Sequence, residues 1–394
     1  MRYKILRQTL SKAYRIAIGL AFYLLDSACL LFLPTPSPRR QHVLVVRLDN
    51  IGDYLIWAGQ LAFLRNKYPQ GEFNLTLLGN QAWTDLAAQS MIFDRVIPLD
   101  TRRFISSLIY RIHIAGVIRR ARFGTVIHPT YSRDFYRGDY IVRLSGALKR
   151  IGSSGDNCNI NPFLKRIADR WYSQLVIADT APLTEIQRNI EFMQGLGIDS
   201  EPRLANLPID VGNLRCGLNK GEYFILFPGA SRNLRRWPLE RFAEIARRIK
   251  LTYGLDGVVC GTAVESPLAF AINKLVDVPL MDLCGKTTLT ELVSVIGNAR
   301  ILVTNETGAA HIGAAVGTPT VCILGGGHFG RFLPYKDPAV QPIMRVIHYP
   351  MDCYGCNWQC RFPIASNEAA PCIDRVEVND AWAGIMQLLD SVSE

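Results

Sequence analysis

Three absences narrow what this 394-residue sequence is expected to do. No stretch interleaves aromatic and basic residues in the way of a nucleic-acid-binding module, so nucleic acid is not an expected partner. No small-residue cleavage pattern precedes the prolines of 34–38, so the apolar stretch before them is not expected to be a cleaved signal peptide. No internal sequence repeat is found, although the two halves described below share a layout.

The N-terminal region combines positive charge with apolar character. Residues 1–15 hold no acid and supply much of the net charge of +10, which suits a phosphate-rich partner such as a nucleotide or an anionic membrane. Residues 16–33 are almost continuously apolar, and as a helix they would rise about 27 Å, just short of a hydrocarbon core. Asp26, near the middle, would be costly in lipid.

Three interpretations of residues 16–33 stay open. They are a spanning helix, an in-plane or re-entrant anchor, and a helix buried on the protein's own surface. We favour a membrane-surface anchor, because the preceding basic stretch can hold anionic lipid while the apolar residues enter the interface.

Short apolar runs alternate with helical segments along the rest of the sequence, which is the pattern of parallel α/β domains. The expected strands form two series, 43–46, 73–79, 95–100 and 124–129, then 223–229, 256–261, a short strand near 279–283, 300–304 and 320–324. A polar stretch with prolines separates the series and is typical of an interdomain linker. The expected organisation is a membrane-associating segment (1–41), a first Rossmann-like domain (42–205), a linker (206–220), a second Rossmann-like domain (221–350), a cysteine cluster (351–375) and a C-terminal helix (376–394).

Two acids follow the first expected strand, at the strand end where domains of this kind bind ligands. Asp49 and Asp53 are both placed to reach such a site, and one of them could act as a general base. The alternative is that Asp53 caps a helix and Asp49 forms a turn.

Two later strand ends carry groups suited to a nucleotide. Ser231 and the backbone amides around it could bind a phosphate that Arg235 or Arg236 neutralises, or the segment could be a solvated loop. Glu265 could accept hydrogen bonds from ribose hydroxyls, or it could simply begin a helix.

The stretch 303-VTNETGAAHIGAAVGTP-319 is expected to form a strand end, a glycine turn, a short helix and the entry to another strand. The helix N-terminus at Gly308 offers unpaired N–H groups and a partial positive charge, which suit a phosphate or pyrophosphate. The alternative is an ordinary βαβ crossover with a glycine in its turn.

Cysteine usage divides into two groups. Six of the ten cysteines are scattered and indicate small buried side chains of a reduced protein. The other four follow the spacing Cys353-x2-Cys356-x3-Cys360-x11-Cys372. Four thiols this close predict a structural zinc or iron site, with free thiols or labile disulfides as the alternative.

Three separated stretches resemble those of glycosyltransferase family 9, the ADP-heptose:lipopolysaccharide heptosyltransferase family. They are 44-LVVRLDNIGDYLIW-57, 227-FPGASRNLRRWPLERFAEIA-246 and 303-VTNETGAAHIGAAVGTPTVCILGG-326, in the order of the family. The resemblance implies an α/β protein of the GT-B fold, with two Rossmann-like domains facing a central cleft. It also implies that the final helix packs back on the first domain.

The resemblance further implies an inverting glycosyltransferase that needs no catalytic metal. In this reading Asp53 takes the proton from the acceptor hydroxyl. The implied donor-binding residues, on the second domain, are Ser231, Arg235, Glu265, Thr287, Glu306, Thr307, Gly308 and His311. Arg235 stands where the family has Lys and Glu306 where it has Asp, so the donor sugar could differ from heptose.

The implied acceptor is an anionic, lipopolysaccharide-type or other lipid-linked glycan. A basic face on the first domain could bind this acceptor. Its residues would be Arg102, Arg103, Arg133, Arg137, Lys149 and Arg150. The alternative is that these scattered bases form an ordinary solvated surface. We take Arg133 and Arg137 as acceptor-binding residues. The expected location is the cytoplasmic face of a bacterial inner membrane, as a peripheral or monotopic protein. The alternatives are the same fold acting on a protein or a capsule/O-chain intermediate, and a non-catalytic nucleotide-sugar-binding membrane protein.

Overall fold

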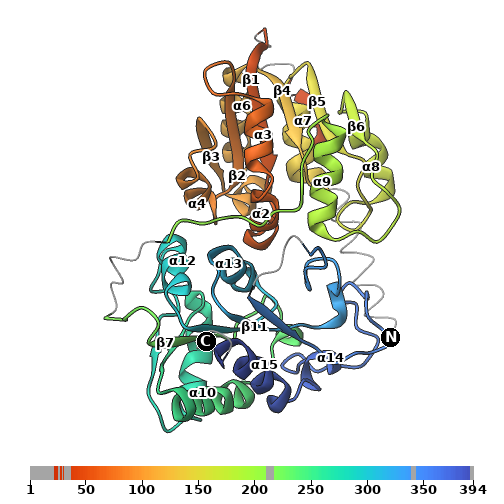
Figure 1. Ribbon diagram of the computed structural model, residues 1–394. Coiled ribbons are helices and arrows are strands. Elements are labelled where there is room, and N and C mark those ends of the chain that lie inside the picture. Colours follow the sequence, from red (N-terminus) through yellow and green to blue (C-terminus); the bar gives the residue numbers. More distant parts are fainter. Residues whose placement is uncertain are drawn as a thin grey trace. The chain divides into compact units, whose positions relative to one another are not determined.

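The computed structural model describes residues 22–24, 27–28, 30, 37–209, 217–338 and 343–390. The chain divides into two compact units, Met1–Asp49 with Arg65–Ala178 and Asn50–Leu64 with Asp179–Glu394. Each unit contains one six-stranded sheet in which all strands are parallel (Figure 1). The predicted α/β class with two Rossmann-like sheets is therefore confirmed.

The sheet of the first unit has the strand order β3-β2-β1-β4-β5-β6, which is the order of doubly wound nucleotide-binding folds. Its strands are β1 (Arg39–Arg47), β2 (Asn74–Asn80), β3 (Arg95–Leu99), β4 (Phe123–His128), β5 (Lys149–Ser153) and β6 (Gln174–Val176). Val43 to Val46 on the central β1 have no exposed surface. A strand buried on both faces needs a continuous apolar run, and this explains why the sequence alone located β1.

The first unit contains helices of different lengths, and some of them begin at recognisable caps. They are α4 (Thr84–Gln89), α5 (Thr101–Ser106), α6 (Leu108–Ala121), the π-helical turn η1 (Phe135–Asp139), α7 (Tyr140–Leu144) and α8 (Pro162–Asp169). The carboxylate of Asp100 accepts the first N–H groups of α5, and Asn161 caps α8, whose first residue is Pro162. Helix α3 (Leu61–Lys67) contains the point where the chain returns to this unit.

Several described residues of the apolar N-terminal segment contact other parts of the first unit. The ring of Tyr23 stacks on Trp171 with centroids 6.3 Å apart, and the Arg143 guanidinium lies 4.4 Å from the centre of the Tyr23 ring. Nη2 of Arg143 also donates to Oγ of Ser27 at 2.9 Å. These residues lie on the protein's own surface, in agreement with one of the three interpretations of this segment.

The membrane anchor itself stays a prediction. The basic stretch 1–15 and Asp26 lie outside the described residues. Within the described ranges, no helix combines the length and the apolar character that a membrane crossing requires.

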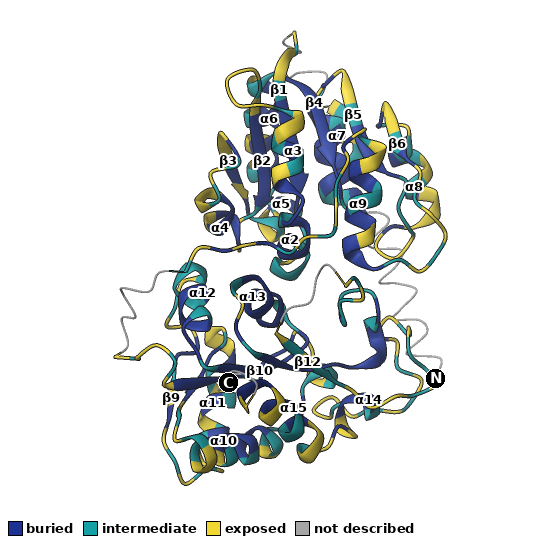
Figure 2. Cartoon of the chain, viewed as in Figure 1, coloured by how far each residue is buried: buried dark blue, intermediate teal, exposed yellow. Residues whose placement is uncertain are grey.

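The sheet of the second unit has the order β12-β11-β10-β7-β8-β9. Its strands are β7 (Tyr223–Phe227), β8 (Asp256–Val259), β9 (Leu280–Asp282), β10 (Ile301–Asn305), β11 (Thr320–Ile323) and β12 (Met344–Ile347). The strands of both sheets are mostly buried (Figure 2). Trp237 anchors this core: it is fully buried, and its Nε1 donates to Val376 O at 2.9 Å.

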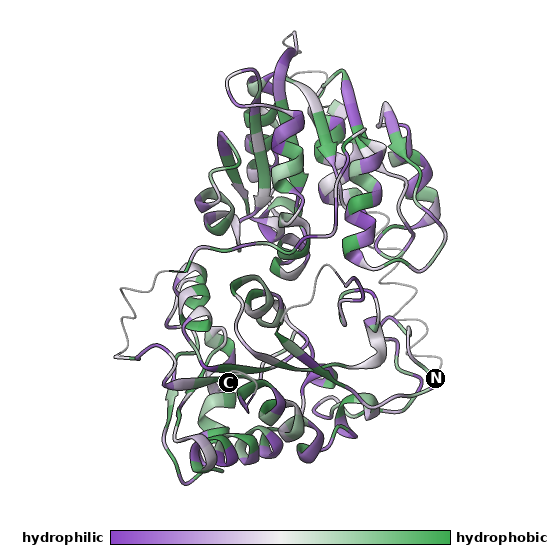
Figure 3. Ribbon diagram, in the orientation of Figure 1, coloured by the Kyte–Doolittle hydropathy of each residue, from purple (hydrophilic) through white to green (hydrophobic). Residues whose placement is uncertain are grey.

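The second unit contains helices of different lengths. They are α2 (Ile51–Ala58), α9 (Glu185–Gly195), α10 (Leu239–Tyr253), α11 (Ser266–Asn273), α12 (Leu289–Gly297), α13 (Gly308–Val316), α14 (Pro371–Asp374) and α15 (Val378–Asp390), with short 3-10 turns η2 (Asn233–Arg235), η3 (Ala263–Glu265) and η4 (Gly326–His328). Figure 3 shows hydrophilic and hydrophobic residues alternating along α10, whose buried residues include Phe242, Ile245 and Ile249.

The position of the final helix corrects one expectation. The resemblance implied that this helix packs back on the first domain. In the structure α15 packs against β11, β12 and α10 of the second unit, and Ile385 and Leu388 belong to the same core as Trp237.

Candidate functional site

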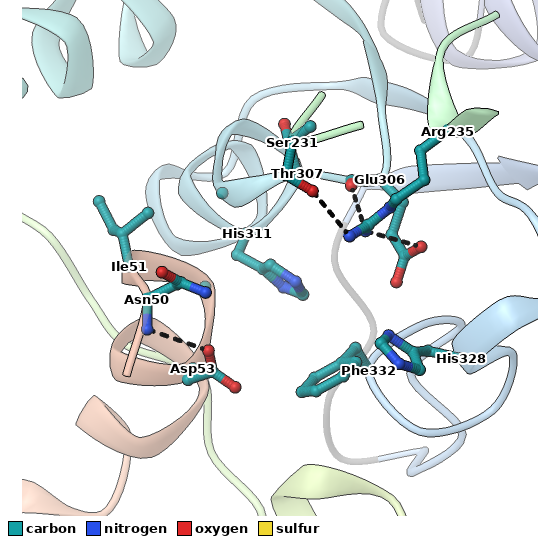
Figure 4. A pocket seen from close by; sticks show the side chains of 12 residues that line it. Asn50, Ile51, Asp53, Ser231, Arg235, Glu306, Thr307, His311, His328 and Phe332 are labelled. Atoms are coloured by element: carbon teal, nitrogen blue, oxygen red, sulfur yellow. Dashed lines mark hydrogen bonds and ion pairs between the residues drawn. The ribbon is translucent and has the colours of Figure 1, made fainter. Parts of the chain in front are cut away.

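A pocket of about 270 Å³ lies within the second unit, at the carboxyl ends of its central strands (Figure 4). It is lined by Asn50, Ile51, Gly52, Asp53, Ser231, Arg235, Glu306, Thr307, Gly308, His311, His328 and Phe332. Seven of the nine residues predicted for catalysis and donor binding are in this set. Parallel strands bring their carboxyl ends to one sheet edge, which is why the loops after β7, β10 and β11 meet here.

The N-termini of two helices meet at this pocket. Thr307 is the N-cap of α13, and its Oγ1 accepts the N–H of Ala309 at 3.3 Å. Two glycines allow the close approach of α2: a Cβ at Gly308 would lie 2.4 Å from Cγ2 of Ile51, and a Cβ at Gly52 would lie 2.9 Å from Cδ2 of His311. Helix N-termini carry free N–H groups and partial positive charge, so the pocket is suited to an anion.

Asp53 belongs to the first turn of α2 and lines the pocket (Figure 4). Its Oδ2 accepts the backbone N–H of Asn50 at 3.2 Å, as in a helix cap. The predicted base and the alternative capping role therefore do not exclude each other. Asp49, the other candidate base, does not line the pocket, and its Oδ1 pairs with Nε of the buried Arg47 at 3.0 Å.

Arg235 and Glu306 form an ion pair in the wall of the pocket. Nη2 of Arg235 lies 3.3 Å from Oε2 of Glu306 and donates to Glu306 O at 3.1 Å, while Nη1 donates to Oγ of Ser231 at 3.3 Å. Only 6% of the Glu306 side chain is exposed. Burial raises the pKa of Glu306 to about 7, against the opposing effect of Arg235. This carboxyl is therefore partly protonated near neutral pH.

His311 faces the pocket from the first turn of α13. Its Nδ1 is 2.7 Å from the hydroxyl of Tyr335, whose pKa is raised by burial. Burial lowers the pKa of His311 to about 4, so the ring is neutral at physiological pH. It can serve as a hydrogen-bonding group but not as a cation.

Two predicted donor residues are not among those that line the pocket. Glu265 is buried, and its Oε2 accepts the N–H and the hydroxyl of Thr262 at 2.8 and 3.0 Å, so it has the capping role named as its alternative. It also fills the space beside Gly229, where a Cβ would lie 1.7 Å from Oε1. Thr287 is half-buried between β9 and α12. Ribose and base contacts at these two residues stay predictions.

The sequence reasoning missed His328 and Phe332 as pocket residues. His328 ends the turn after β11, so the rule that sites follow the carboxyl ends of strands could have found it. Phe332 belongs to a loop without a strand or helix pattern, and its position follows from packing against α2 and α9 in a small apolar cluster.

The predicted acceptor residues in the first unit have different surroundings. Arg133 has no exposed surface and pairs with Asp139 at 3.4 Å and with Asp169. The guanidinium is enclosed by protein and pairs with the buried carboxylate of Asp139 and the partly exposed carboxylate of Asp169. A direct contact of Arg133 with an acceptor stays a prediction. Arg137 is 36% exposed and lies 3.9 Å from Asp134, so its acceptor role stays a prediction.

The four clustered cysteines lie in the loop that precedes α14 and in α14 itself. Cys353, Cys356 and Cys360 are half-buried, and Sγ of the buried Cys372 accepts the N–H of Gly326 at 3.4 Å. Burial raises the pKa of Cys372, and the three neighbouring thiols add to this effect. In the described part of the chain, however, no three His, Cys, Asp or Glu side chains are gathered at metal-binding spacing. Thiols are the ligand type that zinc and iron prefer, and these four lie close to one another. Their side chains are not, however, arranged as a metal-ligand set in the described residues.

Two doubly wound sheets, with a pocket in the second unit formed by helix N-termini and a guanidinium, define an α/β protein with sheets like those of the GT-B fold. The model of glycosyltransferase family 9 (heptosyltransferase) matches residues 136–359. Because this match covers more than half of the chain, the protein belongs to that family.

Curated relatives and solved structures are also similar to this chain. Lipooligosaccharide heptosyltransferase 2 of Haemophilus influenzae is 34% identical over 95 residues, 23% of this chain. The chain spans only 27–41% of the length of the first curated relatives that it matches. The structure of a glycosyl transferase family 9 protein from Veillonella parvula has a TM-score of 0.69 at 20% identity, and the match covers 91% of this chain and 99% of that one.

Two further solved structures share the fold of this chain. E. coli heptosyltransferase WaaC was solved with ADP-2-deoxy-2-fluoro heptose, and it matches with a TM-score of 0.63 at 18% identity over 88% of this chain and 99% of that one. The iron-containing dodecameric glycosyltransferase TibC of enterotoxigenic E. coli matches with a TM-score of 0.56 at 14% identity over 91% of this chain and 79% of that one. At these identities the likeness shows a shared fold.

Proposed function

We propose that this protein is an inverting glycosyltransferase that transfers heptose from ADP-heptose to a lipopolysaccharide-type, lipid-linked acceptor. The observation that carries the proposal is the pocket in which Asp53, Arg235 and the N-terminus of α13 meet. Family membership, and the ADP-sugar analogue bound by WaaC, support the choice of donor.

The diphosphate of the donor lies at the N-terminus of α13. Backbone N–H groups at Gly308 and the guanidinium of Arg235 compensate its charge, because helix N-termini and arginine both favour phosphate oxygens. Ser231, already bonded to Arg235, adds a hydroxyl. Neutral His311 offers a hydrogen bond without a second positive charge.

Asp53 acts as the general base. Its carboxylate takes the proton of the acceptor hydroxyl as the acceptor oxygen attacks the anomeric carbon of the donor sugar. The bond from that carbon to the diphosphate oxygen breaks, the configuration inverts, and ADP leaves with the electron pair. Arg235 and the helix N-terminus stabilise the negative charge that develops on the leaving oxygen. These steps assign no role to a catalytic metal.

The charge of the chain supports the proposed acceptor and the proposed place of action. A net charge of +10 and exposed bases such as Arg102 and Arg103 suit an anionic glycolipid and an anionic membrane surface. We place the protein at the cytoplasmic face of the bacterial inner membrane as a peripheral or monotopic protein.

A structural metal on Cys353, Cys356, Cys360 and Cys372 is the remaining part of the proposal. Their proximity and the iron-containing relative TibC support it. Such a metal would cross-link the loop and has no part in the transfer step.

The test is a transfer assay with purified protein combined with a ligand screen. The unfolding temperature is measured with ADP-, GDP- and UDP-sugars, and we expect the ADP-sugar to raise it most. Transfer of heptose to a lipopolysaccharide acceptor should then be detected by mass. Absence of an ADP preference would contradict the donor, and binding without any transfer or hydrolysis would favour the non-catalytic alternative.

A further inference from the structure

The cysteine-bearing loop is seated on three successive glycines after β11. Gly355 N–H donates to Gly326 O at 2.8 Å, and Asn357 N–H donates to Gly327 O at 2.9 Å. No side chain fits at either acceptor residue, because a Cβ at Gly326 would lie 2.1 Å from the Tyr354 ring and one at Gly327 would lie 2.4 Å from the Trp358 ring. The glycines therefore bring this loop within contact distance of the pocket wall.

Trp358, midway between Cys356 and Cys360, lies directly against the pocket's cation. Only 7% of Trp358 is exposed, and Cζ of Arg235 lies 4.8 Å from the centre of its ring. The carbonyl of Trp358 accepts Nη2 of Arg232 at 2.9 Å. A guanidinium over an indole face is held by a cation–π attraction that is strongest when the pair is shielded from water.

Asn357 makes the equivalent contact to a second pocket residue. Its Oδ1 lies 2.6 Å from Nε2 of His328, which lines the pocket. Asn357 and Trp358 both have left-handed backbone conformations, with φ of +49° and +58°. Two consecutive non-glycine residues in this region are unfavourable, and such a conformation persists only where surrounding contacts enforce it.

We infer that the loop Cys353–Cys360 is a positioning element of the pocket, in which Trp358 orients Arg235 and Asn357 orients His328 toward a nucleoside diphosphate. The inference rests on the proposed function for its ligand. Arginine has many rotamers, so a pocket in which Arg235 is already ordered binds a diphosphate with a smaller entropic cost. The cysteines would then act on the donor site through the shape of this loop.

The first experiment measures ADP affinity by calorimetry in Trp358→Ala and Trp358→Phe. We expect Trp358→Ala to bind ADP about fivefold more weakly than the wild-type chain. Trp358→Phe keeps an aromatic face, so its ADP affinity should lie within about twofold of the wild-type value. Trp382→Ala is the matched control, because it removes an indole from α15 that packs on Tyr253 and does not line the pocket. Equal weakening in Trp382→Ala, or none in Trp358→Ala, would overturn the inference.

A double-mutant cycle tests whether Trp358 acts on ADP binding through Arg235 or through a general loss of structure in the loop. In an Arg235→Ala background, Trp358→Ala should not weaken ADP binding further, whereas an equal effect in both backgrounds contradicts the inference. The same four proteins are unfolded in urea without ligand, and we expect a coupling of about two- to fivefold in the unfolding equilibrium constant. If the wild-type chain does not bind ADP, the proposed function fails, and this ligand-free coupling still decides whether Trp358 holds Arg235.

Discussion

His311 packs against Gly52 so closely that a Cβ at position 52 would lie 2.9 Å from the imidazole Cδ2. The contact joins the first turn of α2 to the first turn of α13, and Gly308 makes the reciprocal contact with Ile51. Asp53 is the residue after Gly52, so the distance between Asp53 and the N-terminus of α13 depends on positions 52 and 308 both being glycine.

Gly308→Ala should therefore push the two helices apart. Its Cβ would lie 2.4 Å from Cγ2 of Ile51, and we expect a loss of about 1–3 kcal/mol in the free energy of unfolding, as for other overpacked sites. Ile51→Ala, added to it, should recover part of this loss by opening space. Gly116→Ala on α6 is the control, because its Cβ would meet only the flexible end of Arg120. Urea unfolding measures all four proteins, and full stability of Gly308→Ala would contradict the packing argument.

Asp53→Asn should abolish proton transfer without loss of the fold. We expect turnover to fall about 10²–10⁴-fold, the usual contribution of a general base, with ADP affinity nearly unchanged. Asparagine keeps an oxygen that can accept the Asn50 N–H, so the unfolding temperature serves as the control. Unaltered turnover would remove Asp53 from the mechanism.

The stability of the fold should depend on pH through Glu306. Its pKa is raised to about 7 in the folded chain from a usual value of 4.5, so the folded state binds more protons than the unfolded state between these values. The stabilisation of the folded state by this proton is complete below about 4.5 and is lost as the pH rises through about 7. Relative to Glu306→Gln, the wild-type chain should lose about 1–3 kcal/mol of unfolding free energy over this range. Urea titrations at several pH values measure this, and parallel curves would contradict the shift.

Protein purified without chelator should contain about one equivalent of zinc or iron if the four clustered cysteines hold a metal. Cys353→Ser combined with Cys356→Ser should lower that content to near zero. Cys158→Ser, which removes an exposed thiol from the first unit, is the control. A wild-type metal content near zero by elemental analysis would rule out the site.

Substitution by alanine should affect Arg133 and Arg137 differently. Arg133→Ala leaves the buried carboxylate of Asp139 without its cation, so we expect a loss of about 3–5 kcal/mol in unfolding free energy. Arg137→Ala should change stability by less than about 1 kcal/mol, because its pair with Asp134 is partly exposed. If Arg137 receives the acceptor, KM for the glycolipid rises in that variant, and an unchanged KM would argue against the role.

The sequence was sufficient to predict the α/β class and the positions of central strands. Val43 to Val46 and Ile301 to Val303 form apolar runs that only doubly buried strands require, and glycines after the strands marked the turns. Arg235 and Gly308 follow β7 and β10 of one sheet, whose parallel strands share a carboxyl edge, so their meeting could be expected from the strand pattern. Asp53 follows β1 of the other sheet, and only the family resemblance had joined it to these residues.

The remaining features depend on tertiary packing that local sequence does not encode. Arginine is usually a surface residue, so nothing in the sequence indicated that Arg133 is buried. Only the fold brings it to Asp139 and Asp169. The resemblance gave the wrong partner for α15, whose apolar side matches the second unit's own sheet. Trp358 carried no functional signal, because its contact with Arg235 joins residues 123 positions apart.

The path of the chain has a practical consequence for dissecting this protein. Asn50–Leu64 is packed in the second unit although it precedes most of the first unit in sequence. A fragment that begins at the predicted linker would lack Asn50 to Asp53 and with them one side of the pocket. Expression of the C-terminal half alone should therefore give a protein with an incomplete site. A synthetic peptide that supplies α2 in trans would be the way to restore it.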